Sequence, residues 1–376
     1  MPASSSLTPE TGSGSMNSHL KRLEKLRSLL PEAKCDAFLI NHPANLNYYT
    51  GYSGDSAYLL LTAEKSCFFT DGRYTTQAAA EIPASIDLIR IAAFKDLGRY
   101  IREKRTLKHL GADENQLCAG SWFKLQQEIS PCEIKTAAAT LSKTRLHKDK
   151  HELKLLRRAV MIAENALENS LHLLQPGTQE SDLAAEIEYQ IRLGGGERAA
   201  FPLIVASGPR SALPHGVASD RLINPGDIVT IDFGACYKGY HSDQTCTFFL
   251  REPETEVRQV YETIYRAQEI GFTALKDKIT GRELDRVVRE HITDAGMGRE
   301  FSHGTGHGVG LEIHEAPSIS QHSQDGELEP GMVFTIEPGC YFPNRWGIRI
   351  EDTIHLSDCG AEKLTTIDKS LDKMIL

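Results

Sequence analysis

The chain has 376 residues, which is more than the roughly 250 to 300 that one hydrophobic core usually supports, so two domains are expected. Apolar residues make up 40% and charged residues 25%, as in globular rather than disordered proteins. The formal charge of -9 comes without any dense block of lysine and arginine, which argues against a nucleic-acid-binding surface.

The sequence also bears on the compartment. No stretch approaches the ~18 to 20 consecutive apolar residues of a membrane helix, and the N-terminus lacks a basic region followed by an apolar core. Neither membrane insertion nor secretion is therefore expected. The eight cysteines are scattered without a CxxC pair, so neither a disulfide framework nor a cysteine zinc site is indicated. The expected location is cytoplasmic.

The N-terminal part of the chain predicts a small α/β domain. Residues 1–15 are rich in Ser, Thr, Gly and Pro, and residues 1–16 are expected to be a disordered leader or a tag. From 17 to 141, helical patterns alternate with short apolar runs. Four of these runs are expected to be strands, at 37–40, 57–62, 66–70 and 86–91.

The second expected domain, 142–376, follows an order of helices and then strands, twice. A helical pattern over 151–174 stops at a Pro-Gly pair, and the next, over 181–193, stops at three consecutive glycines. Strand-like runs continue to residue 249. Helices are expected at 256–276 and 283–295, and more strands follow to the end.

This second part contains an internal repeat. The segment NPGDIVTIDFG at 224–234 aligns without gaps on EPGMVFTIEPG at 329–339, and each is followed by an acid-x-Thr triplet, DQT at 243–245 and EDT at 351–353. The similarity predicts a duplication with two equivalent hairpins that turn near Lys238 and Asn344. The alternative is a chance resemblance of two strands that both follow a Pro-Gly pair.

Each hairpin carries two acids. Asp232 is expected to face Asp243 across one ladder, and Glu337 to face Glu351 across the other. Strand interiors disfavour acidic residues, and a buried carboxylate without compensation is costly. Four converging carboxylates therefore indicate bound metal ions.

A histidine-rich segment, SHGTGHGVGLEIHE at 302–315, is expected to complete this site. His303, His307 and His314 alternate there with glycines, which let the backbone approach a ligand closely. A lone histidine on an apolar face is more often a core residue, but four acids nearby favour the metal site. Carboxylates with one imidazole favour Mn²⁺ and leave Zn²⁺, Co²⁺ and Fe²⁺ open.

These segments resemble the pita-bread metallopeptidases, the family of methionine aminopeptidases, prolidases and Xaa-Pro aminopeptidases. The resemblance runs from about residue 17 to 370 and implies an α+β chain, in which a creatinase-like N-terminal α/β domain precedes a pita-bread fold with pseudo-twofold duplication. It also implies two metal ions, with one chelated by Asp232, both bridged by Asp243 and Glu351, and the other completed by His307 and Glu337.

Other segments resemble the proline-specific branch of that family. TGYSGDSAYLLLT at 50–62 and TDGRY at 70–74 are similar to its N-terminal domain, and a homodimer is implied with it. His215 in LPHG and Arg349 in GIRIEDT match positions that line the branch's substrate site. Tyr341 resembles a wall of the proline pocket, although ordinary packing explains a tyrosine at a strand end equally well.

One motif departs from the family pattern. The segment that often reads SDxTRT is SDQTCT here, so Cys246 stands in place of an arginine and puts in doubt any ion pair formed there. Cys246 is interpreted as a packing residue, because the metal ligands are complete without it. Thr245 is in place to hydrogen-bond a metal-bound hydroxide.

The resemblance thus implies a dinuclear-metal aminopeptidase that hydrolyses the N-terminal Xaa-Pro bond of peptides through a hydroxide that bridges the metals. Glu337 is expected to carry the proton, His215 and His314 to hydrogen-bond the carbonyl oxygen, and His303 with Arg349 to position the substrate. Proline lacks an N–H and fixes φ, so it requires a dedicated pocket.

Three alternatives remain. A prolidase restricted to Xaa-Pro dipeptides differs from the aminopeptidase only in loops and subunit contacts that the sequence does not resolve. A non-catalytic binding protein on the same fold and a metal-free creatinase-type hydrolase are both disfavoured, because all five expected ligands are present.

Overall fold

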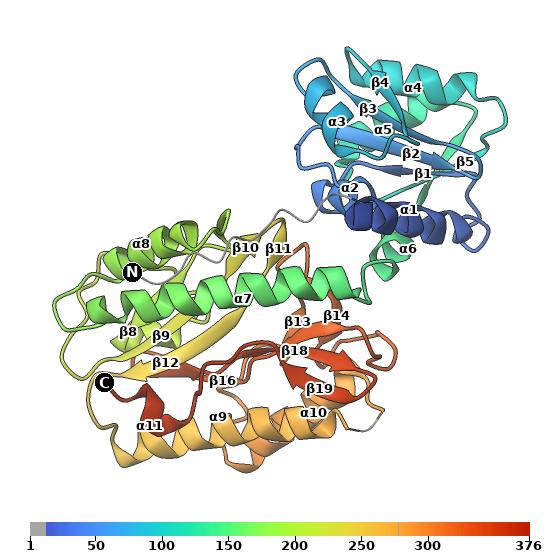
Figure 1. Ribbon diagram of the computed structural model, residues 1–376. Coiled ribbons are helices and arrows are strands. Elements are labelled where there is room, and N and C mark those ends of the chain that lie inside the picture. The colour runs from blue at the N-terminus through green and yellow to red at the C-terminus, as the bar shows by residue number, and fades with distance from the viewer. Residues whose placement is uncertain (1–12, 277) are drawn as a thin grey trace. The chain divides into compact units, whose positions relative to one another are not determined.

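The computed structural model describes residues 13–276 and 278–376, and it divides into two compact units, 1–145 and 146–376 (Figure 1). Residues 1–12 of the leader expected at 1–16 lie outside the described residues. The other four leader residues are not disordered as expected, because helix α1 (Ser13–Ser28) includes them. In the part of the chain that is described, no helix has the length and apolar character needed to cross a membrane.

The N-terminal unit is built on one six-stranded mixed sheet with the strand order β4-β3-β2-β1-β5-β6. Its strands are β1 (Ala37–Ile40), β2 (Ala57–Thr62), β3 (Ser66–Thr70), β4 (Asp87–Arg90), β5 (His109–Ala112) and β6 (Glu133–Thr136). The first four confirm the strands predicted from the apolar runs. The sequence missed β5 and β6, because the first, His-Leu-Gly-Ala, has a single large apolar residue and the second, at the sheet edge, exposes its charged Glu133.

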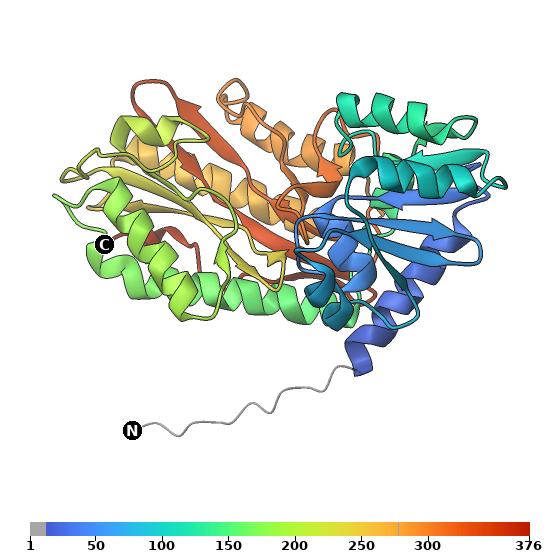
Figure 2. The same ribbon diagram turned by 90° about the horizontal axis from the view of Figure 1, so that it is seen from above.

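Helices cover both faces of this sheet (Figure 2). They are α1, α2 (Pro43–Thr50), α3 (Thr75–Glu81), α4 (Phe94–Glu103), α5 (Ala119–Ile129) and α6 (Ala138–Lys143). On one face, alternate strand residues such as Leu39 and Leu60 pack with Leu97 of α4 and Leu125 of α5 in a single apolar cluster. The sheet is therefore buried on both sides, as its nearly continuous apolar strands require.

In the C-terminal unit, four long helices confirm the predicted helix, helix, strands order. They are α7 (Lys150–Ser170), α8 (Glu180–Leu193), α9 (Thr255–Ala274) and α10 (Gly281–Asp294), with short 3₁₀ turns at Leu171–Leu173 and Gly208–Ala212 and a last helix α11 (Leu371–Met374). Helix α7 begins where it does because the Asp149 side chain accepts from His151 N and Glu152 N, in a capping box. α7 packs on α8, and α9 on α10 (Figure 1).

The strands of this unit form small antiparallel sheets between those helix pairs. The first set is β7 (Arg198–Ala199), β8 (Ile204–Ser207), β9 (Ile228–Phe233), β10 (Ala235–Tyr237), β11 (Tyr240–His241) and β12 (Gln244–Phe249). The second set is β13 (Gly306–Gly308), β14 (Glu315–Ile319), β15 (Val333–Ile336), β16 (Gly339–Phe342), β17 (Trp346–Arg349), β18 (Asp352–Ser357) and β19 (Gly360–Lys363). Each set contains one of the two predicted hairpins.

The first hairpin corrects one expectation. Asp232 on β9 lies opposite Thr245 on β12, and Asp243 does not face it directly. The register follows from a two-residue turn, in which Lys238 and Gly239 both adopt positive φ, 48° and 79°, the conformation of the tight turns that match strand twist. This turn is centred one residue beyond the midpoint of the two acids, so they are diagonal neighbours.

The second hairpin keeps the expected register. It turns around Asn344, which has φ 62°. Glu337 and Glu351 fall between two paired positions, Ile336 with Asp352 and Gly339 with Arg349. The two hairpins meet at an isolated antiparallel bridge between Thr245 and Glu351, so the duplicated halves join where the acids lie.

Candidate metal centre

A cavity of about 480 Å³ in the C-terminal unit contains the candidate site. Every residue that the sequence predicted for the site lines it: His215, Asp232, Asp243, His303, His307, His314, Glu337, Tyr341, Arg349 and Glu351. Apolar side chains, among them Phe201, Ile204 and Ile313, form other parts of the wall. The predicted residues therefore share one space, although more than a hundred positions separate the first from the last.

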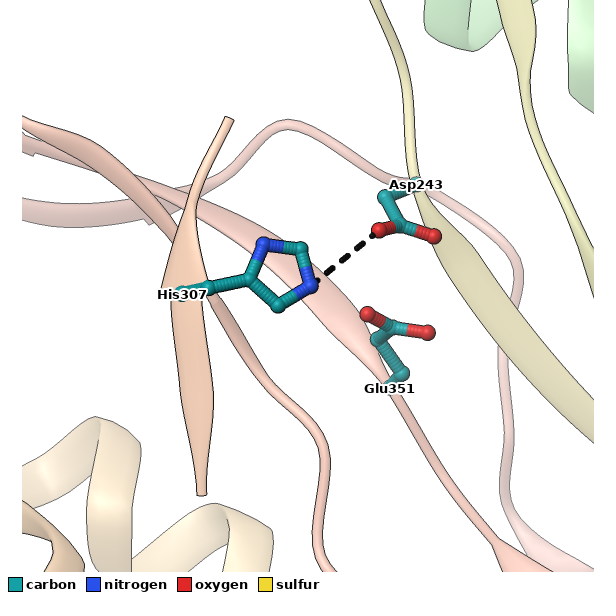
Figure 3. Close-up of side chains that lie close together, drawn as sticks. All are labelled: Asp243, His307 and Glu351. Carbon is teal, nitrogen blue, oxygen red and sulfur yellow. Dashed lines mark ion pairs between the residues drawn. The ribbon is translucent and has the colours of Figure 1, made fainter. Parts of the chain in front are cut away.

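At the centre of this cavity, three side chains bring ligand atoms together (Figure 3). Atoms of Asp243, His307 and Glu351 lie within 4.8 Å of one another. His307 Nε2 lies 3.5 Å from Asp243 Oδ2 and 3.4 Å from Glu337 Oε1. The imidazole comes from β13, and the carboxylates come from residues that flank β12, β15 and β18, so both repeats contribute.

The proton position on His307 suits a metal ligand. Its Nδ1 lies 3.1 Å from the carbonyl oxygen of Gly308, which can only accept a hydrogen bond. Nδ1 must therefore carry the proton, and the lone pair of Nε2 points at the carboxylates. Burial lowers the pKa of His307 below its usual value, which keeps the ring neutral.

The glycines beside His307 allow the strand to lie where it does. A Cβ on Gly306 would stand 2.0 Å from the carbonyl oxygen of Thr335, and one on Gly308 would stand 2.2 Å from that of Ala316. Any side chain at these positions would push β13 away from its neighbours. The alternation of His and Gly in the sequence is thus a requirement of close packing between strands.

Among the described residues, Arg349 pairs with Asp232, but no lysine or arginine forms an ion pair with Asp243, Glu337 or Glu351. Burial raises the pKa of Asp243 well above its usual value, and the charges of Glu351 and Asp232 raise it further. Burial and the charge of Glu337 do the same for the pKa of Glu351. In a low-dielectric site, such repulsion means that the acids are deprotonated together only when cations join them.

One carboxylate oxygen of Asp232 is free to bind such a cation. Asp232 Oδ1 is buried and has no hydrogen-bond partner among the described residues. Its other oxygen, Oδ2, accepts from Arg349 at 2.7 Å. An orphan carboxylate oxygen beside a neutral imidazole and three further carboxylates is the donor set that a divalent cation satisfies.

Arg349 is almost completely buried, and its guanidinium hydrogen-bonds to protein groups. Its side chain is 4% exposed, and its guanidinium donates to Asp232, to Thr245 Oγ1 at 3.1 Å, to Tyr341 Oη at 2.9 Å and to the Pro214 carbonyl at 3.0 Å. It therefore holds Asp232 and Tyr341 in position. Its expected contact with substrate stays a prediction.

His303 and Tyr341 belong to the same network. His303 Nε2 lies 2.9 Å from Tyr341 Oη, and burial lowers the pKa of His303. Burial raises the pKa of Tyr341 to about 12, so it remains a neutral phenol. The network runs from His303 through Tyr341 and Arg349 to Asp232.

His215 and His314 are exposed in the same cavity. The ring of His314 stands edge-on to that of His307, with 4.2 Å between ring centroids. His215 follows Pro214 in a turn closed by a bond from Gly216 N to Leu213 O. Neither ring is a buried core residue, so both can meet a ligand.

Thr245 and Cys246, of the SDQTCT motif that departs from the family pattern, lie on opposite sides of the sheet. Thr245 is fully buried on the cavity side of the sheet, where its hydroxyl donates to Glu351 Oε2 at 2.7 Å. Cys246 is fully buried in the apolar core on the other side, and burial raises the pKa of its thiol to about 12. The packing interpretation of Cys246 agrees with this environment.

An ion pair that the sequence missed supports the histidine segment. Asp285 of α10 accepts from the backbone and hydroxyl of Thr305, and Arg289 pairs with Asp285 and donates to the carbonyl of His303 at 2.6 Å. Thr305 O in turn accepts from Glu337 N at 2.7 Å. An Asp and an Arg four apart on a helix are common surface features, so nothing in the sequence distinguished them.

Two family models match the chain. Residues 154–358 match metallopeptidase family M24, and residues 22–147 match the creatinase/prolidase N-terminal domain. Both matches follow the two units of the structure.

Individual proteins match nearly the whole chain. The Xaa-Pro dipeptidase of Pyrococcus furiosus is 36% identical over 93% of this chain and 99% of its own length. The solved structure of an Xaa-Pro dipeptidase from Bacillus anthracis superposes with a TM-score of 0.90 at 38% identity, over 95% of this chain and 100% of that one. An X-Pro aminopeptidase from Thermotoga maritima gives 0.86 at 34% identity, over 94% and 99%.

Proposed function

We propose, from the premise that the chain belongs to metallopeptidase family M24, that it hydrolyses Xaa-Pro dipeptides. Family membership makes it a peptide hydrolase that depends on divalent metal ions, and the proposal adds the substrate. The observation that carries it is the cavity that the five proposed carboxylate and imidazole ligands line beside exposed histidines, with ligand atoms of Asp243, His307 and Glu351 gathered at its centre. Relatives across the full chain length are named Xaa-Pro dipeptidases.

The dipeptidase replaces the aminopeptidase as the first candidate. The aminopeptidase was the first expectation, although the sequence did not separate it from a dipeptidase, and a curated relative and a solved structure that match nearly all of this chain are named for dipeptides. Aminopeptidase action remains the second candidate, because the Thermotoga protein named X-Pro aminopeptidase has nearly the same fold at 34% identity. Both candidates share the bond that is cut.

The proposed ligands are Asp232, Asp243, His307, Glu337 and Glu351, holding two ions of which Mn²⁺ is the first choice, with Zn²⁺, Co²⁺ and Fe²⁺ as alternatives. Four buried carboxylates with raised pKa values, an unpartnered Asp232 Oδ1 and a neutral His307 support a pair of cations more readily than one. Such ions supply a Lewis acid and lower the pKa of a bound water.

The protein's own groups would then move the proton. Burial raises the pKa of Glu337 above its usual value, so its carboxylate can take a proton from the attacking water. It returns that proton to the proline nitrogen as the C–N bond breaks, which releases the dipeptide's two amino acids. Thr335 Oγ1, 3.3 Å from Glu337 Oε1, helps to orient the carboxylate.

The remaining residues would bind the substrate. His215 and His314, both exposed in the cavity, would donate hydrogen bonds to the carbonyl oxygen as it gains negative charge. His303, Tyr341 and Arg349 would form the wall that accepts proline, with Arg349 acting mainly through the residues that it holds. A cytoplasmic homodimer completes the proposal.

Three peptides test it. Metal-reconstituted enzyme should release alanine from Ala-Pro with a kcat/KM roughly ten-fold or more above that for Ala-Pro-Ala, and should leave Ala-Ala-Ala almost untouched, in line with a site built around one substrate form. Equal rates on Ala-Pro and Ala-Pro-Ala would return the aminopeptidase to first place. Equal cleavage of Ala-Ala-Ala would remove proline specificity altogether.

A further inference from the structure

The strands that carry the proposed bridging acids have a second, buried face. Side chains alternate along a strand, so Asp243, which lines the cavity, and Thr245 lie on one side of the sheet, while Gln244 and Cys246 lie on the opposite side. In the second repeat, Glu351 faces the cavity and Asp352 points away from it toward the same opposite side. We call this side, with Gln244, Cys246 and Asp352, the back face.

A single buried lysine links the two repeats on the back face. The Lys369 side chain is 2% exposed, and its ammonium pairs with Asp352 Oδ1. It also donates to Gln244 Oε1 at 3.4 Å. Asp352 directly follows Glu351, and Gln244 directly follows Asp243, so one cation contacts both strands immediately behind the proposed bridging carboxylates.

The segment that carries Lys369 is itself held in place. The carbonyl oxygen of Lys369 accepts from Tyr261 Oη at 2.8 Å, and Thr365 Oγ1 donates to Asp352 Oδ1 at 2.7 Å. Glu164 of α7 accepts from the backbone and hydroxyl of Thr366. The ammonium is therefore preorganised by its surroundings.

Cys246 lies on the same back face, at the position where the family pattern has an arginine. The family pattern SDxTRT would place an arginine there, and that side chain would project from the back face. The positive charge of Lys369 is close enough to lower the pKa of the Cys246 thiol against the opposing effect of burial. The charge of Lys369 thus acts at position 246 of β12, where the family pattern has the charge of an arginine.

We propose that Lys369 is a positioning residue of the metal centre. It fixes Asp352 and Gln244 from behind, and through them Glu351 and Asp243, in place of the arginine that Cys246 replaces. The proposal rests on the proposed metal site. Lys363 is a natural comparison, because its ammonium lies 3.0 Å from the other oxygen of Asp352 but is 29% exposed and is shared with Glu269.

The consequence of losing the charge follows from the contacts. Without the Lys369 ammonium, Asp352 keeps the partly exposed Lys363 as its cation and the Thr365 hydroxyl, and the Gln244 side chain loses its link to the second repeat. The two strands then hold their bridging carboxylates less rigidly. Residues that orient metal ligands from behind typically cost 10- to 100-fold in metal affinity or activity when they are changed, and a similar loss is expected here.

The experiment measures Mn²⁺ binding to the metal-free full-length protein by calorimetry, with kcat and KM on Ala-Pro alongside. Lys369→Met, which keeps the length and removes the charge, should bind Mn²⁺ at least about 10-fold more weakly and lower kcat with little change in KM. Lys369→Arg should stay within about 3-fold of wild type, and so should the matched control Lys363→Met. Lys369→Met/Cys246→Arg should regain most of the affinity.

The outcomes separate the possibilities. Wild-type affinity in Lys369→Met overturns the proposal. If that variant does not fold, Asp352→Asn/Lys369→Met removes both charges, and wild-type affinity there overturns it equally. Low affinity that persists in Lys369→Met/Cys246→Arg overturns the substitution for the arginine. Absence of Mn²⁺ binding by the wild-type protein would instead be a failure of the proposed function.

Discussion

The pKa values of buried acids are shifted in opposite directions on the two faces of strands β12 and β18. On the cavity side, the carboxylates of Asp243 and Glu351 have pKa values raised well above normal by burial and by the charges of neighbouring carboxylates. On the back face, one residue away, Asp352 is buried to the same degree, yet the charges of Lys369 and Lys363 outweigh burial and lower its pKa. The main difference is that two lysines form ion pairs with Asp352, whereas among the described residues no lysine or arginine does so with Asp243 or Glu351.

Asp352 and Asp243 thus differ in whether the protein itself balances their charge. Asp352 has a lysine on each oxygen and a further hydroxyl from Thr365, so it needs nothing from outside. Asp243 has no lysine or arginine in an ion pair among the described residues, only the neutral His307 at 3.5 Å. Buried acids that a chain leaves without cations are candidates for metal ions, and buried acids that it pairs are not.

The largest expected effect comes from removing one acid on each face. Asp243→Ala should abolish Mn²⁺ binding and lower kcat/KM by on the order of 10³-fold or more, because a proposed shared ligand is lost. Asp352→Ala should instead destabilise the metal-free protein by about 3–5 kcal/mol, since it leaves Lys369 buried without its partner. Calorimetry and urea unfolding measure the two. Retention of either metal or activity by Asp243→Ala would contradict the bridging assignment.

A smaller effect should appear in the pH dependence of the metal-free protein. An acid whose pKa is raised in the folded chain contributes stability while protonated, and that contribution is lost as the pH rises through the folded value. Asp243→Asn should therefore be more stable than wild type at pH 8 in EDTA, by about 1–3 kcal/mol, and the difference should shrink toward pH 5. Urea unfolding at both pH values is the measurement.

Asp352 supplies the internal control for this prediction. Its pKa is lowered in the folded chain, so its contribution is complete above the unfolded value of about 3.9 and is lost only as the pH falls through the folded one. It does not titrate between pH 5 and 8. Equal stabilities of wild type and Asp243→Asn across that range would mean that the cavity acids do not repel one another.

The smallest expected effect concerns the hydroxyl that joins the repeats. Thr245→Val removes the 2.7 Å bond to Glu351 and should weaken Mn²⁺ binding and kcat by about 10-fold. Thr247→Val is the matched control, because that hydroxyl is equally buried two residues along the same strand but bonds the Arg349 backbone. It should change affinity by less than about 3-fold. Similar losses in both variants would reduce Thr245 to a structural residue.

Much of this molecule could be predicted from local patterns. Apolar runs and helix-ending glycines placed four strands and four long helices, because these signals act within a few residues. The repeat of NPGDIVTIDFG in EPGMVFTIEPG identified the four acids, and the SHGTGHG segment identified His307. All ten residues predicted for the site line the same cavity.

Tertiary structure alone decided the relations between distant residues. A turn at Lys238 and Gly239 set Asp232 opposite Thr245, and Arg349 pairs with Asp232 across 117 positions. Lys369 reaches Gln244 across 125 positions, from a C-terminal segment with no motif of its own. Periodicity records which face a side chain takes, but the partner it meets there depends on how the strands and helices pack, and that information is spread over the whole chain.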